Sequence, residues 1–433
     1  MKKHLIPVII IATSLMMSCG DNDSAESIVI PDEEQTNDSS KNNNSNDSMV
    51  IDMLPATRAI NLTKEQKALA QKNNAFAFNL YRSIWQAEKK SNITSPISIT
   101  YMMGMLNDGA NGKTAQEIAQ VLGFNTNRND INEFCKALIS QAPQADPSVI
   151  LQIANIIAAN KDVTLLEAYK HNMQDYYEAE VTSLDFSSPN SLDFLNGWCN
   201  EKSKGMIPSI IDELSPNDLM VLMNAIYFKA TWTEKFDTKD TDEETFTKAD
   251  GSKTTLPMMH RKAEILYGEN EVYSSIRLPF GSGDIWSMYV LLPAEGKTID
   301  DVIKILTNES WEQEKAANNT IVDVKLPRFS TTSDIFLNDI IASLGAPTMF
   351  IPGKADFSNL CDRQQMVINL IKQKAAIEVT EEGTKTSAVT VAKSYGLNGS
   401  TKTVDFHAKR PFVYIIQEMN TKAIFFIGTY LGN

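Results

Sequence analysis

Residues 381–398 read Glu381-Glu-Gly-Thr-Lys-Thr-Ser-Ala-Val-Thr-Val-Ala-Lys-Ser-Tyr-Gly-Leu-Asn398, and this stretch fits two structures. As a strand with a period of two, one of its faces is small and uncharged: Thr384, Thr386, Ala388, Thr390, Ala392 and Ser394. Such a face can enter the middle of a sheet without overpacking it. Gly383, Gly396 and Gly399, however, are typical of a mobile loop. The segment is therefore either an ordinary edge strand or a loop that can become an interior strand.

The sequence on both sides of this stretch decides between the two. In chain order it contains Asn92-Ile-Thr-Ser-Pro-Ile-Ser-Ile, Leu106-Asn-Asp-Gly-Ala-Asn-Gly-Lys-Thr-Ala-Gln-Glu-Ile, Asn224-Ala-Ile-Tyr-Phe-Lys-Ala-Thr-Trp, Phe406-His-Ala-Lys-Arg-Pro-Phe and Phe425-Phe-Ile-Gly. These blocks resemble the signature blocks of the serpins, in the same order and at similar spacing, from about Asn61 to Leu431. Within this resemblance Glu381-Glu-Gly-Thr matches the hinge of the family's reactive-centre loop.

The chain has 433 residues, 42% of them hydrophobic, enough for one large domain or two ordinary ones. Its net charge of -14 argues against nucleic acid or an anionic membrane surface as the partner. Beyond Cys19 there are only Cys135, Cys199 and Cys361, which form neither a disulfide framework nor a metal site. We expect buried free thiols, no cofactor and no metal.

The N-terminus has the features of an export signal. Lys2 and Lys3 precede an apolar run from Leu5 to Met17, which predicts a signal peptide over residues 1–18. The small residue before Cys19 resembles a bacterial lipoprotein cleavage site; the alternative is a plain secretory signal with an incidental cysteine. We expect a secreted protein, either lipid-anchored through Cys19 at a bacterial outer membrane or cell surface, or free in the periplasm or outside the cell.

Residues 19–55 are rich in Asn, Asp and Ser and have almost nothing to bury, so we interpret them as a disordered tether. The resemblance makes residues 56–433 a single serpin domain with its reactive-centre loop at about 381–405.

Helix signals dominate the first part of the folded region. Thr63 with Gln66 and Thr114 with Glu117 are candidate capping boxes, and Pro96 begins a run that is apolar nearly all round, as in a buried helix. Gly123 is a helix stop.

Strand signals dominate the later part. Residues 149–159 fit a strand buried on both faces, and the further candidates are 224–228, 287–292, 322–326, 412–416 and 424–427. This order of elements predicts an α+β domain with a mainly antiparallel sheet. The serpin resemblance adds about nine helices around three sheets and an exposed reactive-centre loop.

The motifs of common enzymes are missing from the sequence. It has four histidines, His4, His171, His260 and His407, and no Gly-x-Ser-x-Gly elbow, His-Glu-x-x-His pair or phosphate-binding Gly-x-x-x-x-Gly-Lys. We therefore expect that the protein is not an enzyme, and we interpret His407 as a surface residue at the end of the loop.

The resemblance implies a suicide-substrate mechanism. A target protease cuts the loop, an acyl-enzyme forms on the protease, and the freed loop inserts into the central sheet as a new strand. The inhibitor acts as a monomer, contributes no catalytic residue and forms a covalent complex with serine proteases, with papain-like cysteine proteases as a second class. The small face of Thr384, Thr386 and Ala388, with no proline from Glu381 to Tyr395, fits insertion.

Counting from the hinge glycine places the reactive bond at Leu397–Asn398, with Lys393 and Tyr395 as secondary sites and Ser400 as the reading for shorter loops. Leu397 suits chymotrypsin-like or elastase-like proteases, whereas Lys393 would admit trypsin-like ones.

The resemblance also assigns supporting residues. The hinge is Glu381, Glu382, Gly383, Thr384, Thr386 and Ala388. The shutter, where the sheet opens, comprises Ser95, Pro96, Ser98, Asn196 and Gln373, with Gln373 in place of the family's common histidine. The breach, at the top of the sheet, comprises Trp232, Lys297 and Glu381, with an expected Lys297–Glu381 ion pair.

Two further functions remain open. One is a non-inhibitory serpin that acts as a carrier or chaperone, and the other is a surface hydrolase or glycan-binding lipoprotein. The small inserting face favours the inhibitor over the carrier, and the missing catalytic motifs argue against the hydrolase.

Overall fold

The computed structural model describes residues 56–124, 127–283, 285–313, 318–361, 363, 366–384 and 403–432. All of them fall within a single unit, Leu54–Asn433.

The described residues contain nine α-helices. They are α1 (Lys64–Ala87), α2 (Pro96–Gly109), α3 (Gly112–Val121), α4 (Arg128–Gln141), α5 (Glu167–Tyr177), α6 (Pro189–Lys202), α7 (Ile299–Ile305), α8 (Asn308–Gln313) and α9 (Asn338–Leu344). None of the helices among these residues is both long and apolar enough to cross a membrane.

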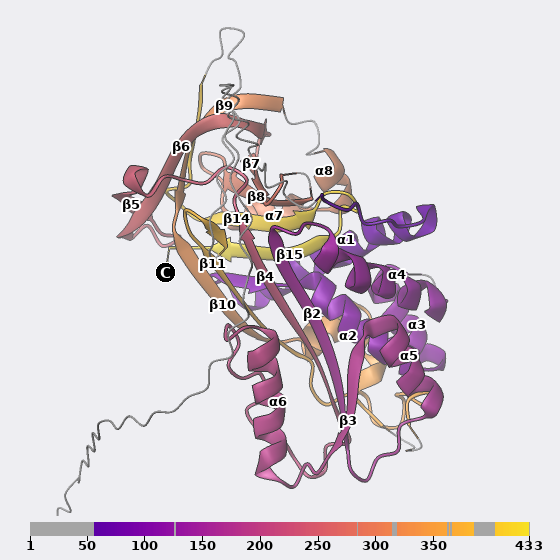
Figure 1. The fold of residues 1–433 in the computed structure, drawn as a ribbon. Helices are drawn as coiled ribbons and strands as arrows, with labels where there is room; N and C mark the ends of the chain where they lie inside the picture. The colour runs from indigo at the N-terminus through magenta and orange to yellow at the C-terminus, as the bar shows by residue number, and fades with distance from the viewer. Residues whose placement is uncertain are drawn as a thin grey trace, which may run out of the picture. The chain divides into compact units, whose positions relative to one another are not determined.

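Fifteen strands accompany the helices in the described residues. They are β1 (Asn92–Thr94), β2 (Val149–Asn160), β3 (Ala179–Leu184), β4 (Met220–Thr231), β5 (Asp242–Thr247), β6 (Lys253–Glu269), β7 (Tyr273–Phe280), β8 (Trp286–Pro293), β9 (Asn318–Pro327), β10 (Phe329–Phe336), β11 (Lys372–Val379), β12 (Gly383–Thr384), β13 (Val404–His407), β14 (Phe412–Glu418) and β15 (Ile424–Tyr430). Every predicted strand lies within one of them. Figure 1 shows α1 to α5 gathered on one side of the folded unit, while α6 lies on the opposite side of β2 and β3 from α5.

These strands form three sheets. The largest has the order β1-β15-β14-β8-β7-β6-β9-β13, with β5 paired to β6; a second has the order β12-β4-β2-β3, and the third is the pair β10-β11. Only β2–β3 and β9–β13 are parallel pairs. The predicted α+β class with mainly antiparallel sheets is therefore confirmed.

Local sequence explains where two of the helices begin. Thr63 and Gln66 form the predicted capping box at the start of α1. The Oγ of Ser95 accepts a hydrogen bond from the Ser98 backbone N–H, and Pro96 occupies the first turn of α2, where no intrahelical N–H is needed. All fourteen residues of α2 are buried, as predicted, because this helix contacts both β4 and β15 and lies between two sheets.

The predicted capping box of Thr114 and Glu117 is wrong. Helix α3 starts at Gly112 with Asn111 as its N-cap. Thr114 accepts a hydrogen bond from the Asp356 backbone N–H, and the Glu117 carboxylate accepts two from Thr348. These side chains hold the segment around residues 348–356 against α3 instead of capping the helix.

Strand β2 also differs in part from its prediction. Its second half is buried, and Ile156 and Ala158 pack in a cluster with Leu195 and Trp198 of α6. Ile150, in the first half, is 50% exposed and lies outside that cluster. The strand is therefore not buried on both faces along its whole length.

The three cysteines of the described region are free and buried, as predicted. Burial raises the pKa of the Cys199 thiol to about 11, which keeps it protonated at neutral pH. These thiols are part of the core.

Candidate functional site

The hinge is already attached to the second sheet. Strand β11 ends at Val379, the chain turns, and β12 pairs antiparallel to β4, with Gly383 opposite Thr231 and Thr384 opposite Ala230. The hydroxyl of Thr384 accepts a hydrogen bond of 2.7 Å from the Ala230 backbone N–H, and the residue is only 3% exposed. The first small residue of the predicted inserting face is thus buried on β12, which forms the edge of this sheet in the described part of the chain.

Gly383 is the residue that allows this attachment. Its φ is +120°, a conformation that L side chains rarely adopt. A Cβ placed there would lie 2.4 Å from the Ala230 carbonyl oxygen and 2.6 Å from the Trp232 nitrogen. Both contacts are with backbone atoms, so a side chain at this position would push β12 away from β4.

Glu381 lies in the turn before β12, and its side chain fixes that turn through hydrogen bonds. Its carboxylate, on a residue that is 3% exposed, accepts hydrogen bonds from Arg328 Nη2 at 2.5 Å and Nε at 3.1 Å, and from Thr241 Oγ1 at 2.8 Å. Burial alone would raise the pKa of Glu381, but the hydrogen bonds from Arg328 and Thr241 outweigh burial and lower it. The carboxylate is therefore ionised at neutral pH.

The predicted Lys297–Glu381 ion pair is corrected by this geometry. Lys297 lies in the turn between β8 and α7, where its backbone N–H donates to the Ala294 carbonyl. The side chain bound to Glu381 is instead that of Arg328, which directly follows β9. A second ion pair, Lys235 with Glu382 at 2.5 Å, fixes the next hinge residue.

Trp232 lies where the breach prediction placed it, beside the hinge. Its indole N–H donates to the Thr380 carbonyl at 2.9 Å, and its ring stacks on Phe280 with 4.4 Å between centroids. Its backbone N–H donates to the Glu382 carbonyl. Trp232 therefore joins the end of β4 to the turn that precedes the loop.

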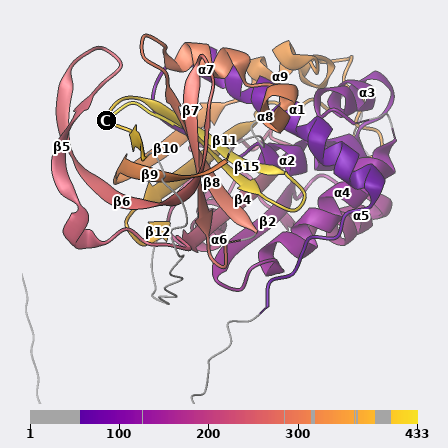
Figure 2. The same cartoon turned by 90° about the horizontal axis from the view of Figure 1, so that it is seen from above.

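Strands β4 and β11 face each other below the hinge, and we call the line between these two strands the seam. Among the described residues, β4 pairs with β2 and β12 while β11 pairs with β10, so the two strands belong to different sheets. Both views place them as the facing strands of those sheets (Figures 1 and 2). Only the two residues of β12 occupy this seam in the described part of the chain.

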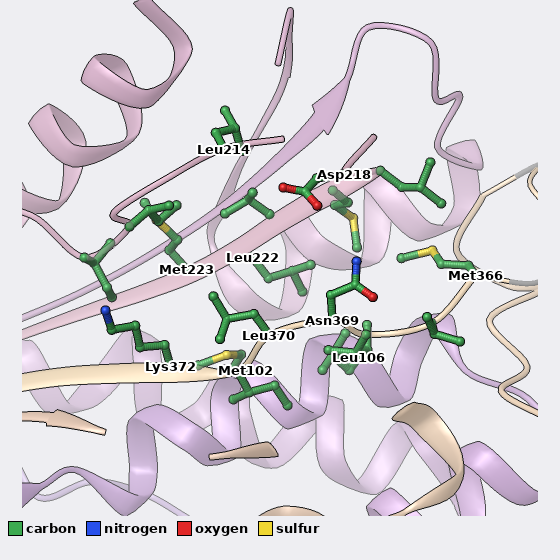
Figure 3. A pocket seen from close by; sticks show the side chains of 18 of the residues that line it. Met102, Leu106, Leu214, Asp218, Leu222, Met223, Met366, Asn369, Leu370 and Lys372 are labelled. Carbon is green, nitrogen blue, oxygen red and sulfur yellow. The ribbon is translucent and has the colours of Figure 1, made fainter. Parts of the chain in front are cut away.

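A cavity of about 250 Å³ lies at the lower end of the seam. Figure 3 shows Leu222 of β4 and Leu370 of the segment before β11 among the residues that line it, with Met102 and Leu106 of α2 below Leu222 in this view. Its lining is mainly apolar, so an apolar or small uncharged segment would fill it favourably.

The start of α2 lies under the seam and binds each side separately. On the β11 side, Gln373 Oε1 accepts hydrogen bonds from Thr94 Oγ1 at 2.5 Å and from the Ser95 N–H at 3.1 Å, while its Nε2 donates to the Ser95 carbonyl. The predicted grouping of Ser95, Pro96 and Gln373 thus lies in one place.

On the β4 side the partner is Asn224, not the predicted Asn196. Ser98 donates its hydroxyl proton to Asn224 Oδ1, and Asn224 Nδ2 donates to Asn155 Oδ1 at 2.8 Å. Asn196 lies on α6, where its side chain binds the backbone of Ile210 and Ile211. Asn196 therefore supports a loop at the edge of the seam and does not contact Ser98.

Several predicted residues lie outside the described part of the chain. These are Cys19, Thr386, Ala388, Lys393, Tyr395, Leu397 and Asn398, together with residues 1–18 and 19–55.

Three contributors were missed by the sequence analysis: Arg328, Thr241 and Asn224. For Asn224 a signal was available, because it opens one of the quoted signature blocks. Arg328 and Thr241 lie 53 and 140 residues from Glu381, and neither stands in a recognisable motif.

The histidines do not form a catalytic pair with serine in the described residues. His171 binds Asp175 at 3.0 Å, and His260 and His407 both face Asp323. The chemistry that the hinge and seam can support is therefore strand addition, in which backbone groups and small side chains do the work.

Comparison with known proteins agrees with this geometry. Residues 71–432 match the family model described as "Serpin (serine protease inhibitor)". Serpin B6 of Macaca fascicularis is 30% identical over 377 residues, which cover 84% of this chain and 98% of that protein.

Two solved structures are similar over most of their length. The native thermophilic serpin tengpin has a TM-score of 0.78 and 28% identity, covering 86% of this chain and 95% of tengpin. Thyroxine-binding globulin in complex with thyroxine has a TM-score of 0.76 and 26% identity, covering 84% and 99%.

Proposed function

This chain belongs to the serpin family, and from that premise we propose that it inhibits serine proteases as a suicide substrate. In this proposal a protease cuts the reactive-centre loop, and the loop then continues the strand that β12 has begun. The protease remains bound as an ester through its catalytic serine and is carried along with the loop.

The observation that carries the proposal is the position of Thr384 at the top of the seam. Pairing of Thr384 with Ala230 is antiparallel, so each further loop residue would move one position back along β4. Extension of this register would place Thr386 opposite Phe228, Ala388 opposite Ile226 and Ala392 opposite Leu222. Since Leu222 lines the cavity, the register would bring a small loop residue to the hollow at the lower end of the seam.

The energy of such an insertion is sufficient to drive the mechanism. About ten new ladder hydrogen bonds at roughly 0.5 to 1.5 kcal/mol each, with the apolar area buried, would yield about 10 kcal/mol or more. Thr384 shows the kind of side chain that the new strand requires, because it is buried with its hydroxyl bonded to the backbone of Ala230. A charge on the same face would lose its water without gaining a partner.

For the target we propose chymotrypsin-like or elastase-like proteases, with cleavage at Leu397–Asn398. Leucine fits an apolar specificity pocket, and Gly396 before it leaves the backbone adaptable. Lys393 would instead be the cleavage site for trypsin-like proteases. Papain-like cysteine proteases are a further class of target.

The direct test mixes the protein with chymotrypsin and with elastase and separates the products on a denaturing gel. We expect a band at the summed mass less that of the released C-terminal fragment, and no such band when the protease serine has first been blocked with a sulfonyl fluoride. Mass spectrometry should find a released C-terminal fragment that begins at Asn398. Complete cleavage with fully active protease would show a substrate and not an inhibitor.

The alternative is a non-inhibitory carrier, and it has a specific observation in its favour. Thyroxine-binding globulin, named for its ligand, has the same fold, and the cavity beside Leu222 could hold a small apolar molecule. A carrier would bind such a molecule tightly and form no covalent complex with any protease tested, so the gel separates the two functions.

For localisation we propose export, with acylation of Cys19 and residues 19–55 acting as a tether. About 37 flexible residues would hold the domain roughly 30 Å from the membrane. Incorporation of labelled fatty acid by the wild type and not by Cys19→Ala would support this; equal labelling would refute it.

A further inference from the structure

A second cluster of titratable side chains lies on three adjacent strands of the largest sheet. The strands β6, β9 and β13 are neighbours in the largest sheet. Asp323 of β9 stands directly opposite Asp405 of β13. His407 comes two residues after Asp405, so it lies on the same face of the sheet, and it stands opposite Lys325. His260 of β6 joins the group through a contact of 2.6 Å between its Nε2 and Asp323 Oδ1.

The two aspartates make an unfavourable pair unless a cation lies between them. Like charges directly opposite each other on neighbouring strands destabilise a sheet. The lysines close by are engaged elsewhere, since Lys325 and Lys409 both bind Glu244. Lys262 pairs in register with Asp323, but no ion pair joins them among the described residues. Asp405 likewise has no ion pair with a described residue.

His407 supplies an unused ligand atom. Its Nε2 is buried and has no hydrogen-bond partner among the described residues, and it lies 3.8 Å from Asp323 Oδ1. The candidate ligand atoms of Asp323, Asp405 and His407 all lie within 4.8 Å of one another. A buried acceptor beside two carboxylates is the arrangement that a metal ion would complete.

We propose that Asp323, Asp405 and His407 bind a divalent first-row transition ion, with zinc as the ion to test. One imidazole nitrogen and two carboxylate oxygens form a mixed set that suits zinc better than magnesium or calcium, which prefer all-oxygen ligands. Ligand atoms of a tetrahedral zinc lie about 3.4 Å apart, given bonds of about 2.1 Å. Atoms that lie within 4.8 Å of one another would close by at most about 1.4 Å when the ion binds, and the exposed side chain of Asp405 has room to move.

His260 is a positioning residue in this site. Its ring nitrogen lies within hydrogen-bond distance of the Asp323 oxygen and fixes the orientation of that carboxylate. Partners of this kind usually change metal affinity by about 10 to 100 fold when they are removed.

The metal would tie β13 to β9, and this has a consequence that rests on the proposed function. Strand β13 is the first described strand after the loop, and it starts at Val404. Insertion of an uncut loop as far as Met220 would use residues 385–394 and leave only residues 395–403 to return to β13. Deep insertion without cleavage would thus pull β13 from β9, whereas insertion after cleavage would not. Bound zinc should therefore slow spontaneous inactivation and leave protease trapping unchanged.

Calorimetric titration of the untagged chain with zinc chloride at pH 7.5 tests the site without any protease. We expect one equivalent to bind, and the affinity to fall at least tenfold in Asp405→Asn and in His407→Ala, and about tenfold in His260→Gln. His171→Ala is the matched control, because it removes a histidine paired with an aspartate elsewhere, and it should bind as the wild type does. Hydrogen exchange at the amides of 404–407 should slow when zinc is added.

No saturable binding, stronger binding of calcium than of zinc, or zinc binding that survives both Asp405→Asn and His407→Ala would overturn the site. The regulatory consequence has its own readout, the half-life of inhibitory activity at 37 °C with and without zinc. An unchanged half-life would refute the consequence alone. Absence of any inhibition would refute the proposed function and leave the zinc titration valid.

Discussion

Arg328 binds Glu381 through two guanidinium nitrogens, at 2.5 and 3.1 Å, at the residue where the chain leaves β11 for the loop. Arg328 itself lies between β9 and β10, so the pair joins the largest sheet to the hinge. The residue two positions before β12 is therefore held by a side chain from the link between β9 and β10.

Removal of Arg328 should loosen the hinge. Arg328→Ala leaves a buried carboxylate with Thr241 as its remaining side-chain donor, at a cost of about 1 to 2 kcal/mol, since the guanidinium is 46% exposed and water screens part of the pair. Denaturant unfolding and hydrogen exchange at Thr384 measure this. Lys297→Ala is the control and should change neither quantity. An equal loss of stability in both variants would support the Lys297–Glu381 ion pair instead.

Acid should weaken the same contact. Because hydrogen bonds from Arg328 lower the pKa of Glu381, its stabilisation is fully present above the unfolded value near 4.5 and is lost as the pH falls below it. Thermal unfolding of the wild type and of Glu381→Gln should differ most at neutral pH, and the difference should shrink as the pH falls below about 4.5. A difference that grows on acidification would contradict the assignment.

A side chain at the hinge glycine should undock β12. Gly383→Ala places a Cβ against the Ala230 carbonyl, so we expect a loss of stability of more than about 1 kcal/mol. Gly251→Ala is the control that separates the steric contact of the Cβ from the backbone strain. Gly251 also has a positive φ, +81°, but an added Cβ there would have no atom within 4 Å. Equal losses in the two variants would mean that strain alone is responsible.

A charge at the first inserting position should convert inhibitor into substrate. Thr384→Arg would have to bury a guanidinium where the threonine is 3% exposed, so the loop should be cut without trapping the protease. The number of inhibitor molecules consumed per protease inactivated should rise at least tenfold. Thr332→Arg, on the exposed face of β10, is the control and should inhibit normally; normal inhibition by Thr384→Arg would refute the inserting face.

The sequence predicted the elements of this fold better than their contacts. Strand positions followed from runs of β-branched and aromatic residues, and α2 from Ser95, Pro96 and the apolar run after them. These signals are local, so one segment suffices to read them. The hinge was found because four consecutive residues, Glu381 to Thr384, carry the family resemblance.

Contacts between distant segments could not be read in this way. The partners of Glu381 and Ser98 depend on strand register and on which face a side chain takes, and one sequence fixes neither. The family resemblance assigned Lys297 to the breach with Glu381, and Asn196 to the shutter with Ser98, without the register that would have tested either contact. The group of Asp323, Asp405 and His407 comes from two strands that only the parallel pairing of β9 and β13 brings together.

Thermal unfolding before and after a single cut in the loop measures most directly whether the fold stores energy for insertion. If the cut loop enters the seam and gains about 10 kcal/mol, the unfolding temperature should rise by roughly 10 °C for a domain of this size. A cut protein that unfolds at the same temperature as the intact one, or lower, would contradict the account.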